Sequence, residues 1–187
     1  MESEQLHRTY LDLTTPHVAD ACMRLGITVR CAPPGTVPLW SGTHLIGRAR
    51  PARHSGSVDV FLEAIDRAEP GEVLVVDNAG RQDEACVGDL VTLEASRAAL
   101  SGILIWGLHR DTAELRTIRL PIFSLGALPV GPQRLDPRDP AALESAMSGP
   151  HSVTAADFVL GDDDGVLFIP LDRADEVAQV ATTIRDT

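Results

Sequence analysis

The sequence predicts a mixed α/β fold, a compact single domain over residues 1–187 with a central mixed sheet flanked by helices. Two short apolar runs rich in β-branched residues, 73–76 and 103–106, are typical of strands buried on both faces. A helix is expected between them, over about 88–100. A strand–helix–strand unit of this length normally forms two parallel strands with a right-handed crossover. A chain of 187 residues can bury a sizeable core as one domain.

The elements before this unit are predicted in order. Thr14-Thr15-Pro16 supplies a hydroxyl cap and a proline in the first turn of a helix, which we expect to end at Gly26. Residues 44–50 are predicted to form a strand. Ser57 opens a second helix with apolar residues at helical spacing, and Pro70-Gly71 ends it.

The elements around and after the unit follow from the same signals. Residues 78–87 are predicted to form a loop, and 121–125 a third strand of the sheet. The proline-rich stretch 129–140 is predicted to be a surface connection within the domain. Two strand-like runs flank Gly161–Gly165, which indicates a hairpin turn rather than a calcium loop, because EF-hand spacing is missing. An amphipathic helix is expected over 172–185.

Composition narrows the class of protein. The formal net charge of −11 argues against general nucleic-acid binding, since a phosphate backbone would be repelled. No apolar run reaches the roughly 18 residues of a membrane span, and the N-terminus lacks the apolar stretch of a secretory signal. The odd set Cys22, Cys31 and Cys86 fits buried thiols in a reducing compartment. We therefore expect a cytoplasmic protein with neither nucleic-acid nor membrane partners.

The predicted topology brings two polar segments together. The helix 88–100 runs back along the strands, so its N-terminus lies at their carboxyl edge, where residues 107–111 also emerge. Open α/β sheets usually bind ligands at this edge. The backbone N–H groups of Gly88, Leu90 and Val91 are expected to be unpaired and able to receive a carboxylate. Gly88 has no side chain, so a ligand can approach closely.

Charged side chains complete the predicted site. Arg110 can hold a carboxylate or an enolate oxygen through its planar fork. Asp89 and Asp111 are hard oxygen ligands that suit a magnesium- or manganese-like ion. Such a set suits a small anionic substrate whose negative charge grows during the reaction.

Simpler interpretations exist for each of these residues. Asp111 can cap a helix over Thr112–Ile118, and Arg110 can form a surface ion pair. Asp89 is favourable in a first helical turn by charge alone. For His109, next to Arg110, a polar loop residue is a better interpretation than a pocket residue. The histidines show no spacing typical of zinc sites.

At these residues the chain resembles the RraA-like family, which comprises the 4-hydroxy-4-methyl-2-oxoglutarate aldolases and the regulators of ribonuclease E activity. Active members carry an aspartate, twenty intervening residues and then Arg-Asp, a spacing that Asp89, residues 90–109, Arg110 and Asp111 reproduce. Further short motifs resemble the family in order along the chain: residues 15–20, 47–49, 70–77, 121–123 and 164–170.

The resemblance implies a fold of the swivelling β/β/α type, a homotrimer or hexamer, and a site near a subunit boundary. Apolar faces on the terminal helices are expected to support that assembly. By the family's pattern, Asp111 binds Mg²⁺ or Mn²⁺, Arg110 binds a 2-oxo acid and Asp89 holds a water molecule of the ion's shell. The backbone of Gly88–Val91 receives the substrate carboxylate. Arg110 and Asp89 are the expected catalytic residues.

The implied function is a divalent-metal-dependent lyase that acts on 2-oxo acids through a pyruvate enolate. The reaction is cleavage of 4-hydroxy-4-methyl-2-oxoglutarate, decarboxylation of oxaloacetate, or both. Two features depart from the family: Trp106-Gly107 stands where an Asp-Gly pair is frequent, so the indole could narrow the pocket, and no equivalent can be placed for an acid that aldolases contribute to a neighbouring subunit. The alternatives are a non-catalytic inhibitor of a ribonuclease and a metal-binding relative with a changed substrate.

Overall fold

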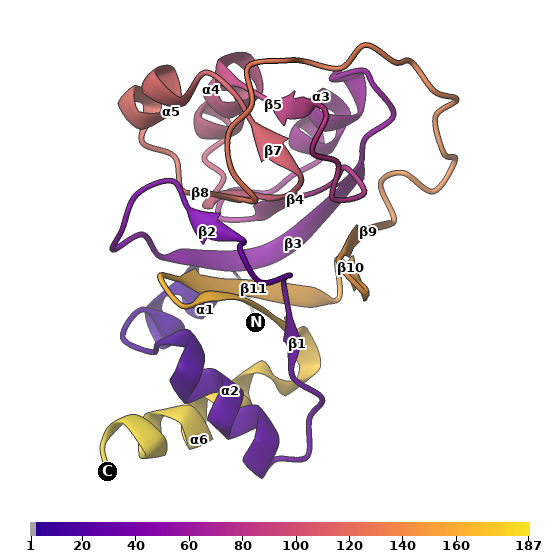
Figure 1. Cartoon of the computed structure of the whole chain (residues 1–187). Helices are drawn as coiled ribbons and strands as arrows, with labels where there is room; N and C mark the ends of the chain where they lie inside the picture. Colours follow the sequence, from indigo (N-terminus) through magenta and orange to yellow (C-terminus); the bar gives the residue numbers. More distant parts are fainter. Residues whose placement is uncertain (1–2) are drawn as a thin grey trace.

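The computed structural model describes residues 3–187, which form an eight-stranded mixed sheet with helices on both sides (Figure 1). The strand order is β1-β12-β11-β3-β4-β6-β8-β2. The bounds are β1 Arg30–Cys31, β2 Val37–Pro38, β3 Leu45–Arg53, β4 Val73–Asp77, β6 Gly102–Trp106, β8 Ile122–Ser124, β11 Asp157–Asp162 and β12 Gly165–Pro170. This confirms the predicted mixed α/β class.

The long strand β3 joins two differently built halves of the sheet. Its first residues, 45–48, pair antiparallel with β11, whereas residues 49–53 pair parallel with β4. Strands β4, β6 and β8 continue the parallel half, as the strand–helix–strand pattern predicts. The carboxyl ends of these parallel strands therefore share one edge, which is where the candidate site lies.

The helices form two groups, one on each side of the sheet (Figure 1). One group packs with the parallel half: α3 Asp59–Asp66, α4 Asp89–Arg97 and α5 Thr112–Ile118. The other packs with β11, β12 and the start of β3: α1 Ser3–Tyr10, α2 Thr15–Arg24 and α6 Ala174–Arg185. Short pieces complete the chain: β5 Ala85–Val87, β7 Leu108–His109, β9 Ser145–Ser148, β10 His151–Thr154 and the 3-10 turn Leu171–Arg173.

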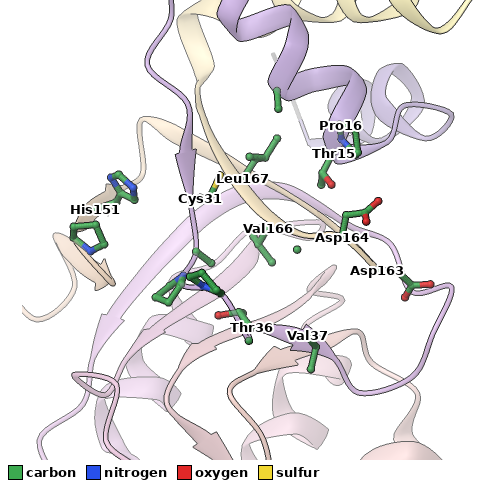
Figure 2. Close-up of a pocket in the computed structure, with 17 residues that line it drawn as sticks. Thr15, Pro16, Cys31, Thr36, Val37, His151, Asp163, Asp164, Val166 and Leu167 are labelled. Carbon is green, nitrogen blue, oxygen red and sulfur yellow. The ribbon is translucent and has the colours of Figure 1, made fainter.

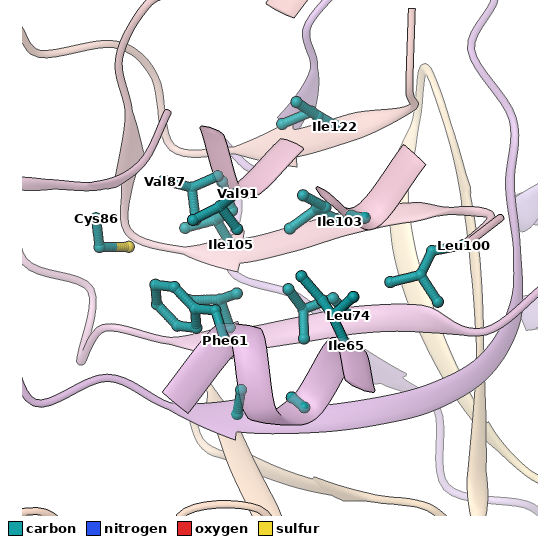
Figure 3. Close-up of a cluster of buried hydrophobic side chains, with 14 of the residues drawn as sticks. Phe61, Ile65, Leu74, Cys86, Val87, Val91, Leu100, Ile103, Ile105 and Ile122 are labelled. Atoms are coloured by element: carbon teal, nitrogen blue, oxygen red, sulfur yellow. The ribbon is translucent and has the colours of Figure 1, made fainter. Parts of the chain in front are cut away.

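A core beneath α3 and α4 fixes the parallel half (Figure 3). Phe61 from α3, Val91 from α4 and Ile103 from β6 are almost fully buried in it. Complete burial of such a side chain stabilises the folded state by about 1.5–3 kcal/mol. The N-terminal turn of α4 is therefore held rigidly against the sheet.

Most predicted helices and strands are confirmed, with shifts at their ends. Helix α2 begins after Thr14, whose hydroxyl accepts a hydrogen bond from the His17 backbone N–H, and Gly26 follows it with φ of +67°. The predicted hairpin turn at 161–165 is confirmed between β11 and β12. The strand expected over 44–50 extends to Arg53 because its second half gains β4 as a partner.

Three expectations are wrong. The segment 78–87, expected to be a loop, ends in strand β5 at Ala85–Val87. The apolar face of α6 is not free for assembly, because Val177, Ala178 and Ala181 are buried in a cluster shared with α1 and α2. The Tyr10 hydroxyl also donates to the Ala174 carbonyl at 2.6 Å, which ties α1 to α6. Cys31 was expected to be buried and is exposed, whereas Cys22 and Cys86 are buried.

Between residues 3 and 187, no helix has the length and apolar character needed to cross a membrane.

Candidate active site

The N-terminus of α4 and the segment after β6 meet at the carboxyl edge of the parallel strands. The short strands β5 and β7 pair in parallel, which places the ends of both segments side by side. The Arg110 backbone N–H then donates to the Val87 carbonyl at 3.0 Å. Arg110 and Asp111 consequently lie next to Gly88, as the topology of the sequence predicts.

These residues line one cavity of about 240 Å³. The six residues of the predicted substrate and metal site are all in its wall: Gly88, Asp89, Leu90, Val91, Arg110 and Asp111. Further residues complete the lining: Val58, Ala85, Cys86, Gly131, Pro132 and Gln133. Two distant stretches of the chain, Gly88–Val91 and Arg110-Asp111, thus share a space suited to a small ligand.

The capping interpretation of Asp111 is wrong. Asp111 precedes α5, but its side chain makes no hydrogen bond to that helix. Its Oδ2 instead accepts a hydrogen bond from the Asp89 backbone N–H at 3.2 Å. The residue adopts a left-handed conformation with φ of 59°, which costs a non-glycine residue on the order of 1 kcal/mol. The backbone at Asp111 is therefore strained, in a conformation that directs its carboxylate towards the N-terminus of α4.

Gly88 is required by the close approach of these charged groups. A Cβ atom on Gly88 would lie 2.3 Å from Asp111 Oδ2 and 3.3 Å from Arg110 Nε. Such a separation is far below any van der Waals contact, so a side chain at position 88 would displace the aspartate. The sequence predicts a close approach at Gly88, and the structure shows that the site's own side chains make it.

The backbone N–H groups of this turn are only partly available. The Leu90 N–H was expected to be unpaired, but it donates to Asp89 Oδ1 at 2.8 Å. Among the described residues, the amides of Gly88 and Val91 have no hydrogen-bond acceptor. An anion at this helix end would therefore meet the Gly88 and Val91 amides, whereas the Leu90 side chain is 74% exposed at the rim.

Arg110 provides the positive charge of the cavity. Its side chain is 47% exposed, and its Nε lies 3.4 Å from Asp111 Oδ2. Within residues 3–187 this is the only carboxylate within ion-pair distance of Arg110. Since the pair lies inside the cavity wall, the guanidinium keeps donors for a ligand rather than forming a pair elsewhere on the surface.

The neighbours His109 and Trp106 do not line the cavity. His109 is buried, with Nδ1 2.8 Å from Ser124 Oγ and Nε2 3.2 Å from Thr112 Oγ1. Burial, and to a lesser extent Arg116, lower the pKa of His109, so it is a neutral structural residue rather than an exposed loop residue. The Trp106 indole packs at Gly80, so it does not narrow this cavity.

Several lining residues carry no sequence signal. Cys86 is buried, and burial raises the pKa of its thiol, so it contributes a neutral wall. Gly131 and Gln133 belong to the proline-rich stretch, which the sequence identifies only as a surface connection. No group of three or more His, Cys, Asp or Glu side chains suited to a metal ion occurs within residues 3–187. Asp89 and Asp111 are thus the carboxylates that the cavity offers.

A larger cavity of about 590 Å³ shares no lining residue with this site (Figure 2). It lies between the start of α2, the segment around β1 and the β11–β12 hairpin. Its walls include Pro33, Pro34, Val166 and Leu167. The Thr36 hydroxyl in its lining is buried and has no hydrogen-bond partner within the described part of the chain.

Comparison with known proteins identifies the family to which the chain is similar. A family model described as RraA-like, Aldolase/RraA, matches residues 15–168. Protein DlpA of Legionella pneumophila is 32% identical over 158 residues, which cover 80% of this chain and 25% of that protein. A protein of Halalkalibacterium halodurans with the provisional name 4-hydroxy-4-methyl-2-oxoglutarate aldolase is 29% identical over 145 residues, 77% of this chain and 68% of that protein.

Solved structures agree with the family model. The crystal structure of Streptomyces coelicolor RraAS2, described as an unusual member of the RNase ES inhibitor RraA protein family, has a TM-score of 0.84 and 26% identity. The match covers 97% of this chain and 92% of that structure. Since the family model spans most of the sequence and the fold agrees throughout, this chain belongs to the RraA-like family.

Proposed function

We propose that this protein is a divalent-metal-dependent lyase that cleaves small 2-oxo acids through a pyruvate enolate. The observation that carries the proposal is the convergence of Arg110, Asp111 and the Gly88–Val91 turn on one cavity of about 240 Å³. The name of the Halalkalibacterium relative supports a 2-oxo acid as the substrate class. The two candidate reactions are cleavage of 4-hydroxy-4-methyl-2-oxoglutarate and decarboxylation of oxaloacetate.

The substrate carboxylate binds at the N-terminus of α4. The amides of Gly88 and Val91 have no acceptor within residues 3–187, and the helix dipole adds partial positive charge equivalent to about half an elementary charge at this end. This placement leaves the keto group of the substrate within the part of the cavity that contains Arg110 and Asp111.

Arg110 stabilises the charge that develops during bond cleavage. When the bond beyond C3 breaks, its electron pair moves into the 2-oxo acid and generates an enolate oxygen. The guanidinium interacts more strongly with this oxyanion than with the neutral ketone, and such differential binding accelerates the reaction. The partial exposure of Arg110 leaves its outer N–H groups available for this contact.

The donor set fits Mg²⁺ or Mn²⁺ at Asp111. Magnesium sites typically keep several water molecules and use one or two protein carboxylates. Asp111 Oδ1 has no hydrogen-bond donor among residues 3–187, and Asp89 lines the same cavity. Bound there, the ion would polarise the keto oxygen and add Lewis-acid stabilisation to the enolate.

Asp89 has a separate task in this scheme. Its Oδ1 accepts from the Leu90 N–H at 2.8 Å, which holds the carboxylate at the cavity and leaves the second oxygen for an ordered water. Aldol cleavage needs a base to remove the proton of the C4 hydroxyl, and Asp89 acts as that base through the water. Decarboxylation starts from an ionised carboxylate and needs no such base. Oxaloacetate decarboxylation therefore depends less on Asp89.

Pyruvate formation from purified protein tests the proposal. The protein is incubated with oxaloacetate or 4-hydroxy-4-methyl-2-oxoglutarate, each with Mg²⁺, with Mn²⁺ or without added metal. We expect pyruvate from at least oxaloacetate at a rate above the metal-only background. No enzyme-dependent pyruvate from either substrate under any of these conditions would refute the assignment.

The exposed apolar rim of the cavity supports assembly into a homotrimer or hexamer. Leu90 is 74% exposed, and Val58 and Leu62 are also exposed on the adjacent α3 segment. Since α6 has no free apolar face, we propose that this rim is covered by a second copy of the chain. Light scattering at micromolar concentration is expected to give a trimer or hexamer mass, and a monomer mass would contradict this assembly.

A ribonuclease-binding function is the second candidate. It is favoured by the net charge of −11, which suits a basic protein partner, and by the structural similarity to RraAS2. An inhibitor needs no cavity chemistry, so Arg110→Ala would leave ribonuclease inhibition unchanged while removing pyruvate formation. Inhibition by a protein without lyase activity would favour this second function over the first.

A further inference from the structure

An irregular segment forms one wall of the candidate active site. Residues 129–136, which we call the strap, belong to the long connection between β8 and β9, which runs past β5 and β7 (Figure 1). Gly131, Pro132 and Gln133 of the strap line the cavity. The strap has no regular secondary structure, so its position depends on specific contacts.

Two backbone hydrogen bonds hold the strap near its ends. The Ala85 N–H donates to the Val130 carbonyl at 2.7 Å, and the Asp136 N–H donates to the Ser55 carbonyl at 2.8 Å. Gly56 leaves room for the strap, because a Cβ at that position would lie 2.1 Å from the Arg134 carbonyl oxygen. These contacts fix the strap on both sides of the residues that line the cavity.

A forked ion pair adds a third anchor. The Arg134 Nε lies 3.2 Å from both carboxylate oxygens of Glu84, and its Nη2 lies 2.9 Å from Oε1. Nη2 also donates to Asn78 Oδ1 at 3.1 Å. Glu84 is buried, and Arg134 is the nearest of its cationic partners, since Arg81 Nε lies 3.6 Å and His54 Nδ1 3.7 Å from its Oε1. The pair therefore resists any lifting of the strap.

The strap touches the active-site arginine at Gly131. A Cβ on Gly131 would lie 2.8 Å from Arg110 Nη1 and 3.7 Å from Arg110 Cζ, with no other neighbour within 4 Å. The bare backbone of Gly131 thus borders the space that the Arg110 guanidinium occupies. Within residues 3–187, Arg110 forms an ion pair only with its neighbour Asp111, at Nε, whereas the strap borders its Nη1.

We propose that the strap positions the Arg110 guanidinium for the substrate. Arg134 holds the strap on Glu84, and Gly131 sets how far the guanidinium can move out of the cavity. Gly131 and Arg134 are positioning residues, since they act through Arg110. The structural part of this inference stands on the contacts alone, and its effect on turnover rests on the proposed lyase function.

Gly131→Ala is the sharpest variant. Its methyl group would meet only the flexible end of Arg110, so the guanidinium has to shift while the fold is preserved. A displacement near 1 Å from a productive geometry can cost roughly 100-fold in rate, so we expect kcat/KM to fall by about 10- to 100-fold with an unchanged melting temperature. Leu135→Ala is the matched control on the strap, because Leu135 is 78% exposed and does not line the cavity; it should leave turnover unchanged.

Arginine Nε–H signals in NMR spectra report the guanidinium position without any assay of activity. The Arg110 signal is assigned by its absence in Arg110→Lys. We expect it to shift in Gly131→Ala and to stay in place in Leu135→Ala. An unmoved Arg110 signal in Gly131→Ala overturns the proposal. A shifted signal in a protein whose wild type turns over no 2-oxo acid leaves the positioning intact and refutes the lyase function.

The Arg134 anchor is tested by a graded pair. Arg134→Met removes the fork and the charge, and Arg134→Lys keeps the charge without the fork. We expect the Arg110 signal and kcat/KM to change most in Arg134→Met and to recover partly in Arg134→Lys. Loss of stability in both variants with an unmoved Arg110 signal would make the ion pair purely structural. Arg134→Met leaves the buried Glu84 with only the longer contacts to Arg81 at 3.6 Å and His54 at 3.7 Å among the described residues, so if it fails to fold, Arg134→Lys alone decides.

Discussion

The two cavities of this protein differ in chemistry more than in size. The larger one, about 590 Å³, has mostly apolar walls and no arginine or lysine in its lining. Its Asp163 is already engaged, since the carboxylate accepts hydrogen bonds from the Ser41 hydroxyl and the Gly42 N–H. The smaller one, about 240 Å³, combines free amides, a guanidinium and two carboxylates. Volume alone would favour the larger cavity, whereas convergent polar groups, which mark a candidate reactive site, favour the smaller one.

The glycines of the two cavities show the same contrast. Gly35 and Gly165 in the larger cavity have positive φ angles, and a Cβ on either would meet nothing within 4 Å. They serve turns. Gly88 and Gly131 in the smaller cavity border Asp111 and Arg110 so closely that a Cβ would collide with them. In the smaller cavity the glycines leave room for charged side chains, whereas in the larger cavity they form turns.

Removal of divalent metal should give the largest effect. The smaller cavity offers few carboxylates, so the ion is held largely by water and binds weakly. Treatment with a chelator followed by gel filtration should reduce pyruvate formation to the level of the protein-free control. Mg²⁺ or Mn²⁺ should restore it. Full turnover after chelation would remove the metal from the mechanism.

Arg110→Ala should lower turnover of both substrates by roughly 100- to 1,000-fold, the cost of losing one preorganised oxyanion donor. The reason is that enolate stabilisation is common to both reactions. Arg97→Ala is the control, because Arg97 lies at the C-terminal end of α4, does not line the cavity, is 65% exposed and, within residues 3–187, pairs only with Glu94. Steady-state rates with oxaloacetate and with the aldol substrate measure both variants. Near wild-type rates in Arg110→Ala would contradict the role of Arg110 and favour the larger cavity as the reactive site.

Asp89→Asn should separate the two reactions. An asparagine oxygen can still accept from the Leu90 N–H, so the turn is preserved while the base is lost. We expect kcat for aldol cleavage to fall by about 100-fold, in the range of general-base effects, and decarboxylation by less than tenfold. Parallel rate measurements on both substrates decide this. Equal losses in the two reactions would contradict the separate role of Asp89.

The sequence predicts the fold class and which candidate residues meet, but not the conformation of those residues. The strand–helix–strand pattern places Gly88 and Arg110 at one edge, because parallel strands and a crossover helix leave no other arrangement. The close approach at Gly88 is predicted for a ligand, whereas in the structure Asp111 and Arg110 make it. The left-handed backbone of Asp111 and the bond between its carboxylate and the Asp89 N–H carry no local signal, since helix capping is the more frequent use of an aspartate before a helix.

Long-range packing explains the remaining differences. The strap lies at the cavity because Arg134 pairs with Glu84, fifty residues earlier in the chain, and no periodicity reports such a pair. The apolar face of α6 is buried against α2 although the sequence allows an exposed face. An amphipathic pattern predicts that one face of a helix is buried. Which element buries that face depends on the topology of the chain.

Thr36→Val should have the smallest effect and tests the larger cavity directly. The Thr36 hydroxyl is buried without a hydrogen-bond partner in the described residues, and valine has almost the same shape. Removal of an unsatisfied buried polar group relieves a desolvation penalty, so the free energy of unfolding should rise by about 1 kcal/mol. Chemical denaturation measures this change, and pyruvate formation should stay within twofold of wild type because Thr36 lies outside the smaller cavity. If turnover instead falls tenfold or more while stability rises, the hydroxyl serves a ligand, and the larger cavity takes part in the reaction.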